Sequence, residues 1–303
     1  MTQSAQIDAN AYHVLLVSDA NYSAFLATTI VSILKNAATE DRLVFHIVDS
    51  GLTQADRDSV EKLKEIRDFE YLFYQPDLQK YLNVFCDDIQ SFPVVVNHRL
   101  FATSFLPEAL EKIIYMDVDV VVLDSLRGLW NVDTGDAILA AVYDPNIRLS
   151  HRRAIGLDDD YKYFNSGVLV MNLKKWREVN ATDEMLKIAA EIKENIDFPD
   201  QDVLNVYCAR HAHTLAPKEW NVHPRDYREG ETKLLHFMGS RQRCPHLDIL
   251  YSYAAETPYR ALPMQGLAYR INRGVQRAFC NTLCFFFFPR KIRRAIRRRF
   301  NLR

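Results

Sequence analysis

The first part of the chain alternates between short apolar runs and stretches in which apolar side chains recur at helical spacing. Tyr12–Val17 is an apolar run that ends at a polar segment, and Leu43–Val48 is a second one. Runs of this length between polar turns are typical of buried strands. Between them, Phe25 and Ile33 lie on one face of a predicted helix. Strands that alternate with helices predict a mostly parallel sheet flanked by helices on both faces.

The alternation continues through residues 1–256. A helix is predicted for Thr53–Arg67, because Thr53 can cap its first turn and apolar residues recur at helical spacing behind it. The other predicted elements are strands at Tyr71–Tyr74, Lys112–Met116, Val120–Leu123, Ala137–Tyr143 and Gly167–Asn172, and a helix at Ala181–Glu194. No internal repeat or flexible linker interrupts this pattern, so residues 1–256 are predicted to form one α/β domain.

Charge divides the chain into two parts. Residues 257–303 carry 12 Lys and Arg and no acidic residue, whereas 26 Lys and Arg stand against 39 Asp and Glu before them. In this basic aromatic tail, Ile292, Ile296 and Phe300 recur every four residues and form an apolar stripe among arginines. The composition is that of an amphipathic segment at an anionic membrane surface, and we predict that residues 270–303 attach there.

Two alternatives remain for this tail. It can pack on the acidic body as a helix whose arginines form ion pairs there, or it can bind nucleic acid. The acidic charge of the preceding residues argues against a nucleic-acid partner.

Cysteine usage and the N-terminus bear on the location of the protein. An odd number of cysteines without a Cys-x-x-Cys pair fits reduced thiols better than a disulfide framework. The first 13 residues lack the pattern of a signal peptide, and no run of about 20 apolar residues predicts a membrane-spanning helix. We therefore expect a cytoplasmic protein at the inner face of the membrane. The five cysteines are Cys86, Cys208, Cys244, Cys280 and Cys284.

An acidic pair lies where one predicted strand ends. Asp117 and Asp119 follow Lys112–Met116 directly, and Val118 between them can point back into the core. Two carboxylates in this position suit Mn²⁺ or Mg²⁺ that bridges phosphate groups. The alternative is a solvated or capping role, because acidic pairs of this spacing are common.

A histidine far along the chain is the third candidate ligand. His236 follows two leucines, and a lone histidine in such a context is usually a packed core residue. If it joins the two aspartates, its nitrogen completes a mixed site that prefers Mn²⁺ over Ca²⁺. Gly239 would then let the backbone approach a diphosphate, and Arg241, Gln242 or Arg243 would interact with its charge.

These residues belong to an ordered series of segments that resembles glycosyltransferase family 8. This family comprises retaining enzymes of the GT-A fold, including bacterial lipopolysaccharide glucosyl- and galactosyltransferases and glycogenin. The resemblance spans roughly residues 12–246. Its segments are Val17–Tyr22, Arg99, Leu106–Glu108, Lys112–Asp119, Leu129–Trp130, Tyr163–Leu169, Met171–Arg177, Asp200–Asn205 and His236–Ser240.

The resemblance implies a function and a metal cofactor. Residues 1–256 would be a nucleotide-sugar-dependent catalytic domain that moves glucose or galactose from a UDP-sugar to a glycan or glycolipid acceptor such as lipopolysaccharide, with retention. Mn²⁺, with Mg²⁺ as the alternative, would be held by Asp117, Asp119 and His236. Val118 is assigned to the nucleotide-sugar site together with the two aspartates.

Four further residues are assigned to the donor by the resemblance. Asp19 and Asn21 would contact the uracil and ribose, and Arg99 would reach the sugar or its phosphates. Asp144 matches a position close to sugar and acceptor. The alternatives are a loop cap for Asp19 or Asn21, a surface ion pair for Arg99 and a strand-end turn cap for Asp144.

The catalytic set implied by the family is Asn165, Asp200 and Gln201, which would line the donor sugar. Polar groups of this kind bind hydroxyls that an apolar wall would leave unpaired. Because an amide is a poor nucleophile, Gln201 argues against a covalent carboxylate intermediate and favours front-face transfer. The segment after His236 departs from the family pattern, and Arg243 is the better phosphate partner there by its charge.

Two other functions stay open at this level. One is a non-catalytic scaffold at the membrane that binds a nucleotide-sugar, against which the three candidate metal ligands argue. The other is a self-glycosylating enzyme similar to glycogenin, which the basic tail does not support.

Overall fold

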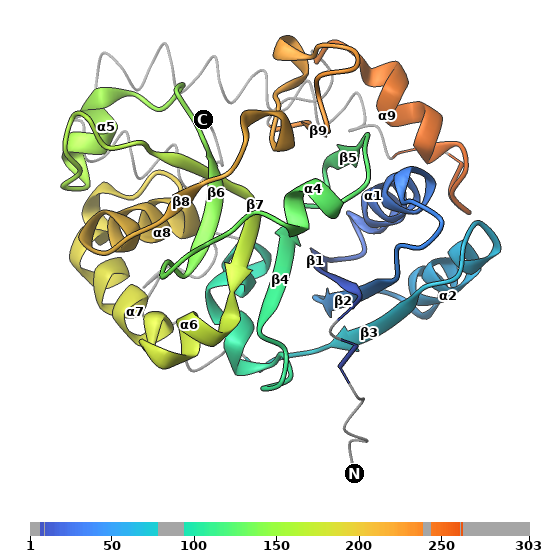
Figure 1. The fold of residues 1–303 in the computed structure, drawn as a ribbon, viewed down its shortest axis with the longest axis horizontal. Helices are drawn as coiled ribbons and strands as arrows, with labels where there is room; N and C mark the ends of the chain where they lie inside the picture. Colours follow the sequence, from blue (N-terminus) through green and yellow to red (C-terminus); the bar gives the residue numbers. More distant parts are fainter. Residues whose placement is uncertain (1–6, 9, 78–93, 239–243, 261, 263–303) are drawn as a thin grey trace, which may run out of the picture.

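A mixed sheet organises the part of the chain that the computed structural model describes, residues 7–8, 10–77, 94–238, 244–260 and 262. Its seven strands have the order β3-β2-β1-β4-β7-β6-β8 (Figure 1). Neighbours among β1 to β4 are parallel, β7 is antiparallel to β4 and β6, and β8 is parallel to β6. The strands are β1 (Tyr12–Ser18), β2 (Leu43–Asp49), β3 (Glu70–Tyr74), β4 (Lys112–Met116), β6 (Leu139–Tyr143), β7 (Phe164–Asn172) and β8 (Thr214–Leu215).

Helices cover both faces of this sheet, as the sequence pattern predicts. The side chains of β1 alternate between two buried clusters: Val14 and Leu16 pack with residues of α1, and Leu15 and Val17 pack with residues of α8. The helices α1 (Ser23–Asn36), α2 (Gln54–Lys62) and α9 (Leu247–Ala254) contribute to the first cluster, and α6 (Leu173–Glu178), α7 (Ala181–Ile192) and α8 (Pro199–Arg210) contribute to the second (Figure 1). Two further short helices are α4 (Arg127–Trp130) and α5 (Leu149–Ala154).

Most predicted elements are present, with shifted ends. Thr53 caps α2 in a reciprocal capping box, but α2 ends at Lys62 and a 3₁₀ turn, Leu63–Glu65, follows it. In the same way α7 gives way to a 3₁₀ turn at Lys193–Asn195. β6 begins two residues later than predicted, because Ala137 donates its backbone N–H to Thr134 within a turn. β7 begins three residues earlier than predicted, because its first residues pair with the end of β6.

One edge of the sheet collects the ends of strands that carry the polar motifs. β1 and β4 are parallel, so their carboxyl ends lie at this edge. β7 runs the other way, and Val168 in its middle pairs with Met116 at the end of β4, so the residues before Val168 extend past that end. The amino end of β7 therefore lies beside the acidic pair that follows β4, and ligands of α/β proteins bind at this kind of edge.

A separate two-stranded ribbon crosses above this edge. It pairs β5 (Val120–Val122) with β9 (Leu234–His236), antiparallel, with Val120 opposite His236 (Figure 1). The ribbon rests on α1, whose buried Thr29 donates its hydroxyl to the backbone oxygens of Val118 and Val120, each at 2.9 Å. This pairing brings residue 236 next to residue 119, across more than a hundred residues of sequence.

Three predictions fall partly or wholly outside the described residues. These are the membrane-binding tail, of which 257–260 and 262 are described, and the phosphate contacts of Gly239 and Arg243. Within the described ranges, no helix has the length and apolar character needed to cross a bilayer. Among the described residues, Cys208 is a buried free thiol and Cys244 a partly buried one.

Candidate functional site

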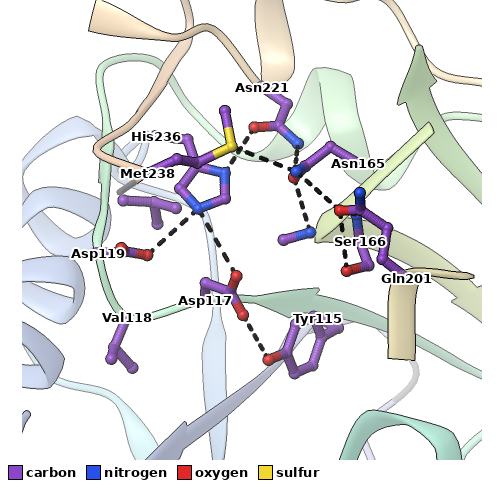
Figure 2. Close-up of polar contacts among 12 residues, drawn as sticks. Tyr115, Asp117, Val118, Asp119, Asn165, Ser166, Gln201, Asn221, His236 and Met238 are labelled. Atoms are coloured by element: carbon purple, nitrogen blue, oxygen red, sulfur yellow. Dashed lines mark hydrogen bonds and ion pairs between the residues drawn. The ribbon is translucent and has the colours of Figure 1, made fainter. Parts of the chain in front are cut away.

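Asp117, Asp119 and His236 form a compact cluster at the edge of the sheet (Figure 2). One ligand atom from each side chain lies within 4.8 Å of the other two. The Nε2 atom of His236 is 3.3 Å from Oδ1 of Asp119 and 3.6 Å from Oδ2 of Asp117. Val118 between the aspartates is buried in the core, as the sequence predicts. Backbone bonds fix the cluster, because Asp117 donates its N–H to Gly167 and Phe237 donates its N–H to Asp119.

The electrostatics of this cluster suit a cation. Oδ1 of Asp117 already accepts hydrogen bonds from Tyr115 and Arg99, each at 2.7 Å, so Oδ2 is the atom that faces His236. Burial lowers the pKa of His236, but the carboxylates of Asp119 and Asp117 outweigh this effect and raise the pKa above its usual value. Two carboxylate oxygens and one imidazole nitrogen at these separations are a ligand set that fits Mn²⁺ or Mg²⁺.

Gly167 makes this cluster sterically possible. A Cβ atom built on Gly167 would lie 2.1 Å from Cε1 of His236 and 2.8 Å from Oδ2 of Asp117. The imidazole therefore rests directly against the backbone of β7. Glycine is required at this position because the imidazole lies too close to the backbone for any side chain, a reason that the sequence alone does not reveal.

Arg99 links the cluster of Asp117, Asp119 and His236 to Asp200, one of the residues that the sequence predicts as catalytic. It is 3% exposed, which excludes the surface ion pair considered as an alternative. Its guanidinium pairs with Asp117 and, through Nε at 3.2 Å, with Asp200, and it also donates to Ser166. Its cationic carbon lies 4.2 Å from the ring centre of Tyr115. The structure thus places Arg99 where its charge balances the carboxylates of Asp117 and Asp200.

Asp200 is held by these contacts within the protein. It accepts a hydrogen bond from the hydroxyl of Ser166 at 2.8 Å in addition to its ion pair with Arg99. Burial raises the pKa of Asp200 above its usual value, and Arg99 and Ser166 oppose this rise. The carboxylate of Asp200 would have to be released from both contacts before it could attack a sugar.

A row of amide side chains continues from the histidine across the amino end of β7 (Figure 2). Asn221 contacts His236 and donates to Asn165 at 2.9 Å, and Asn165 donates to Gln201 at 3.0 Å. The sequence predicts Asn165 and Gln201 as site residues but not Asn221. A single asparagine after a buried tryptophan has no distinctive pattern, so only the folded structure identifies Asn221.

A second group of polar residues continues the row from Gln201 into the interior of the protein. Gln201 donates to the hydroxyl of Tyr163 at 3.2 Å, and Tyr163 donates to Asp202 at 2.6 Å. Asp202 is fully buried and also contacts His151 of α5 at 2.8 Å. Burial lowers the pKa of His151, but its interactions with Asp197 and Asp202 outweigh this effect and raise the pKa to about 9. Tyr163 and His151 are not among the site residues that the sequence predicts.

The remaining predicted donor residues lie around the same edge of the sheet. Asp19 and Asn21 follow β1, and Asp144 follows β6. Asp19 accepts a hydrogen bond from the backbone of Tyr22 at 3.1 Å, and Asp144 accepts one from the backbone of Asn146 at 2.9 Å. These bonds are those of the capping alternatives. The second oxygen of Asp19 accepts a hydrogen bond from the side chain of Asn21 at 3.4 Å. The assignments of these residues to the donor stay predictions.

Comparison with solved structures defines the class of this fold. A galactosyltransferase, LgtC, determined in complex with donor and acceptor sugar analogs, superposes with a TM-score of 0.69 at 23% identity, over 85% of this chain and 99% of the other. The glycosyltransferase GlyE of Streptococcus pneumoniae TIGR4 gives a TM-score of 0.60 at 18% identity, over 80% and 60%. The architecture is therefore the GT-A fold of glycosyltransferases, as the sequence predicts.

The sequence itself assigns the family. Residues 13–241 match the model of glycosyl transferase family 8, and the chain belongs to that family. A putative glycosyltransferase of Haemophilus influenzae is 32% identical over 65% of this chain and 59% of its own length. A lipopolysaccharide 1,2-glucosyltransferase of Escherichia coli is 28% identical over 67% and 60%. The chain thus spans about three fifths of the length of these relatives.

Replacing Gly167 by alanine should displace His236 from the aspartates. We expect Gly167→Ala to weaken Mn²⁺ binding by about 10-fold or more, because the new methyl group overlaps the imidazole. Electron paramagnetic resonance of free Mn²⁺ measures this change. Gly230→Ala is the control, since Gly230 has a positive φ but open space around it, so it costs stability without reaching the cluster. Unchanged Mn²⁺ binding in Gly167→Ala would show that the close approach of His236 to β7 does not govern metal affinity.

The raised pKa of His151 predicts a pH-dependent stability. Because the folded-state pKa of about 9 exceeds the usual 6.5, the stabilisation is fully present below pH 6.5 and is lost as the pH rises through 9. His151→Gln should lower the free energy of unfolding by about 2–3 kcal/mol near pH 6, after allowance for solvent screening, and by much less near pH 9.5. Urea unfolding at both pH values tests this. His211→Gln, which breaks an exposed pair with Glu184, should show a small effect.

Proposed function

We propose that this protein is a metal-dependent retaining glycosyltransferase that moves a hexose, glucose or galactose, from a UDP-sugar to a glycan acceptor. The observation that carries the proposal is the cluster of Asp117, Asp119 and His236 beside the row of amides. The membership of the chain in glycosyl transferase family 8 and its GT-A fold support the proposal. A cation next to groups that bind hydroxyls is what a sugar diphosphate requires at its two ends.

The cofactor we propose is Mn²⁺, with Mg²⁺ as the alternative. Asp117 through Oδ2, Asp119 and His236 through Nε2 would hold it, because these are the atoms that converge. When bound, such an ion supplies positive charge to the diphosphate as the sugar bond breaks. Arg99 keeps Asp117 oriented for this role and offsets the charge of Asp200 nearby.

The donor sugar would lie against Asn165, Asp200 and Gln201. Gln201 uses its oxygen to accept from Asn165 and from the backbone of Ser166, and it lacks the negative charge of a nucleophile. The two carboxylates of the same segment are also engaged, Asp200 by Arg99 and Asp202 by Tyr163. These contacts support front-face transfer, in which the acceptor hydroxyl attacks from the side that UDP leaves.

The proposed acceptor is a surface glycan or glycolipid such as lipopolysaccharide. The similarity to lipopolysaccharide 1,2-glucosyltransferases of Escherichia coli supports this class of acceptor. Asp144, Asp19 and Asn21 follow strands at the same edge and would complete the donor and acceptor contacts. Gly239 and Arg243 would contact the diphosphate. The basic tail would hold the enzyme at the inner face of the membrane, next to a glycolipid substrate.

A donor screen tests the proposed reaction. With Mn²⁺ and a truncated lipopolysaccharide acceptor, we expect transfer from UDP-glucose or UDP-galactose, read by mass spectrometry, with the anomeric configuration of the donor kept in the product. Chelation should abolish transfer. Asp117→Asn, Asp119→Asn and His236→Ala should each lower kcat/KM by about 10²-fold or more, because each removes a ligand of the cation whose charge would balance that of the phosphates.

The variants are compared with Asp133→Asn, an acidic residue in a loop away from the cluster whose side chain caps Gly135. This control should transfer sugar at the wild-type rate. UDP binding without transfer to any acceptor would favour the scaffold, and sugar added to a tyrosine of the protein itself would favour the self-glycosylating alternative. Full activity of the chelated enzyme would refute the proposed metal dependence.

Deleting residues 270–303 tests membrane attachment. We expect the shortened protein to lose binding to liposomes that contain anionic lipid and to keep its activity on a soluble acceptor. Each basic residue near such a surface contributes roughly 1 kcal/mol, so binding of the full chain should weaken as salt is added. Co-sedimentation with anionic and neutral liposomes measures this. Equal binding by both proteins would show that the tail does not attach the enzyme.

A further inference from the structure

The orientations of the amides beside the metal cluster follow from two backbone groups. The backbone N–H of Gly167 lies 2.9 Å from Oδ1 of Asn165, and that of Ser166 lies 3.1 Å from Oε1 of Gln201. A backbone N–H can only donate, so both side-chain positions must be oxygen. The hydrogen bond that Nδ2 of Asn165 donates to Oε1 of Gln201, 3.0 Å long, agrees with both assignments. Which end of each amide is oxygen is thereby settled by chemistry.

The far end of the row is fixed independently. Asp202 is fully buried and accepts hydrogen bonds from the backbone N–H groups of Asp197 and Phe198, each at 2.9 Å. It also accepts from Tyr163, so the Tyr163 oxygen is left to accept from Nε2 of Gln201. This again turns Oε1 of Gln201 toward Asn165. The row is therefore a chain of hydrogen bonds with one direction.

The same assignment of donors and acceptors can be extended through Asn221 to His236, a proposed metal ligand. Oδ1 of Asn165 accepts from Nδ2 of Asn221 at 2.9 Å, and this leaves Oδ1 of Asn221 facing Nδ1 of His236 at 2.9 Å. An amide oxygen can only accept, so Nδ1 of His236 carries a hydrogen. The lone pair of the neutral imidazole then lies on Nε2, the nitrogen that faces Asp119 and Asp117.

We propose that Asn221 is a positioning residue that fixes the tautomer of His236 and couples the metal end of the site to the sugar end. This inference rests on the metal site of the proposed function. Asn221 turns Nε2 toward the metal through its oxygen and holds Asn165, beside Gln201, through its nitrogen (Figure 2). Partners of this kind orient metal-binding histidines and raise their affinity.

Two replacements of Asn221 separate its two contacts. Asn221→Leu has similar size and removes both, so we expect the dissociation constant for Mn²⁺ to rise about 10- to 100-fold. Asn221→Asp keeps an oxygen for Nδ1 of His236 but sets a second oxygen against Oδ1 of Asn165. It should bind Mn²⁺ much as the wild type does, while kcat falls. A purely structural role would not produce this split between metal affinity and turnover.

Mn²⁺ alone is the probe, followed by electron paramagnetic resonance, and thermal melting checks that each variant is folded. The matched control is Asn172→Ala, which removes an asparagine from the other end of β7, where its side chain caps α6 at 2.9 Å. Its Mn²⁺ affinity should equal that of the wild type. In addition, ¹⁵N nuclear magnetic resonance of the Mg²⁺-saturated wild type should show His236 protonated on Nδ1.

Different outcomes refute different claims. Wild-type affinity in a folded Asn221→Leu variant overturns the positioning role alone, as does protonation of His236 on Nε2. Asn221→Asp binding as weakly as Asn221→Leu also overturns it, because the oxygen would then be irrelevant. A wild type that binds neither Mn²⁺ nor Mg²⁺ removes the proposed cofactor, and the inference falls with it.

Discussion

The mutual repulsion of carboxylates at one edge of the sheet is the constraint on which this site depends. Asp117 and Asp119 lie close together, and the charge of Asp117 is near enough to raise the pKa of buried Asp200. Like charges in a partly buried position are costly unless cations or hydrogen bonds balance them. Arg99 supplies one fixed cation between Asp117 and Asp200, and the imidazole of His236 faces the other side. The arrangement is thus prepared for a further positive charge.

Close backbone packing makes that balance possible. The antiparallel direction of β7 places its amino end beside the end of β4. There the backbone N–H groups of Ser166 and Gly167 donate to the side chains of Gln201 and Asn165. Gly167 has no side chain there, and the imidazole of His236 fills the space that a Cβ atom would occupy. The ribbon of β5 and β9 fixes His236 opposite Val120. The pairing of strands that are distant in sequence therefore brings the candidate ligands together, and no local sequence pattern does so.

The polar network extends the site into the interior. From His236 it passes through Asn221 and Asn165 to Gln201, and from there to buried Asp202, with one direction of donation throughout. A satisfied buried network of this kind resists rearrangement, because turning any one amide leaves unpaired groups on both sides. The proposed metal ligands and the residues proposed to contact the sugar are consequently held in one geometry.

The sequence by itself determined the alternating elements, the acidic pair at the end of β4 and, through its resemblance to a family, the residues that converge on it. These features depend on periodicity, strand ends and ordered motifs, all of which are local. It did not reveal Asn221, the burial of Arg99 or the reason for Gly167. Those depend on the pairing of His236 with Val120 and on the reversed strand β7, contacts between residues far apart in the chain that only the tertiary structure decides. Long-range pairing leaves no periodic trace in the sequence, because it requires complementary surfaces rather than a local pattern.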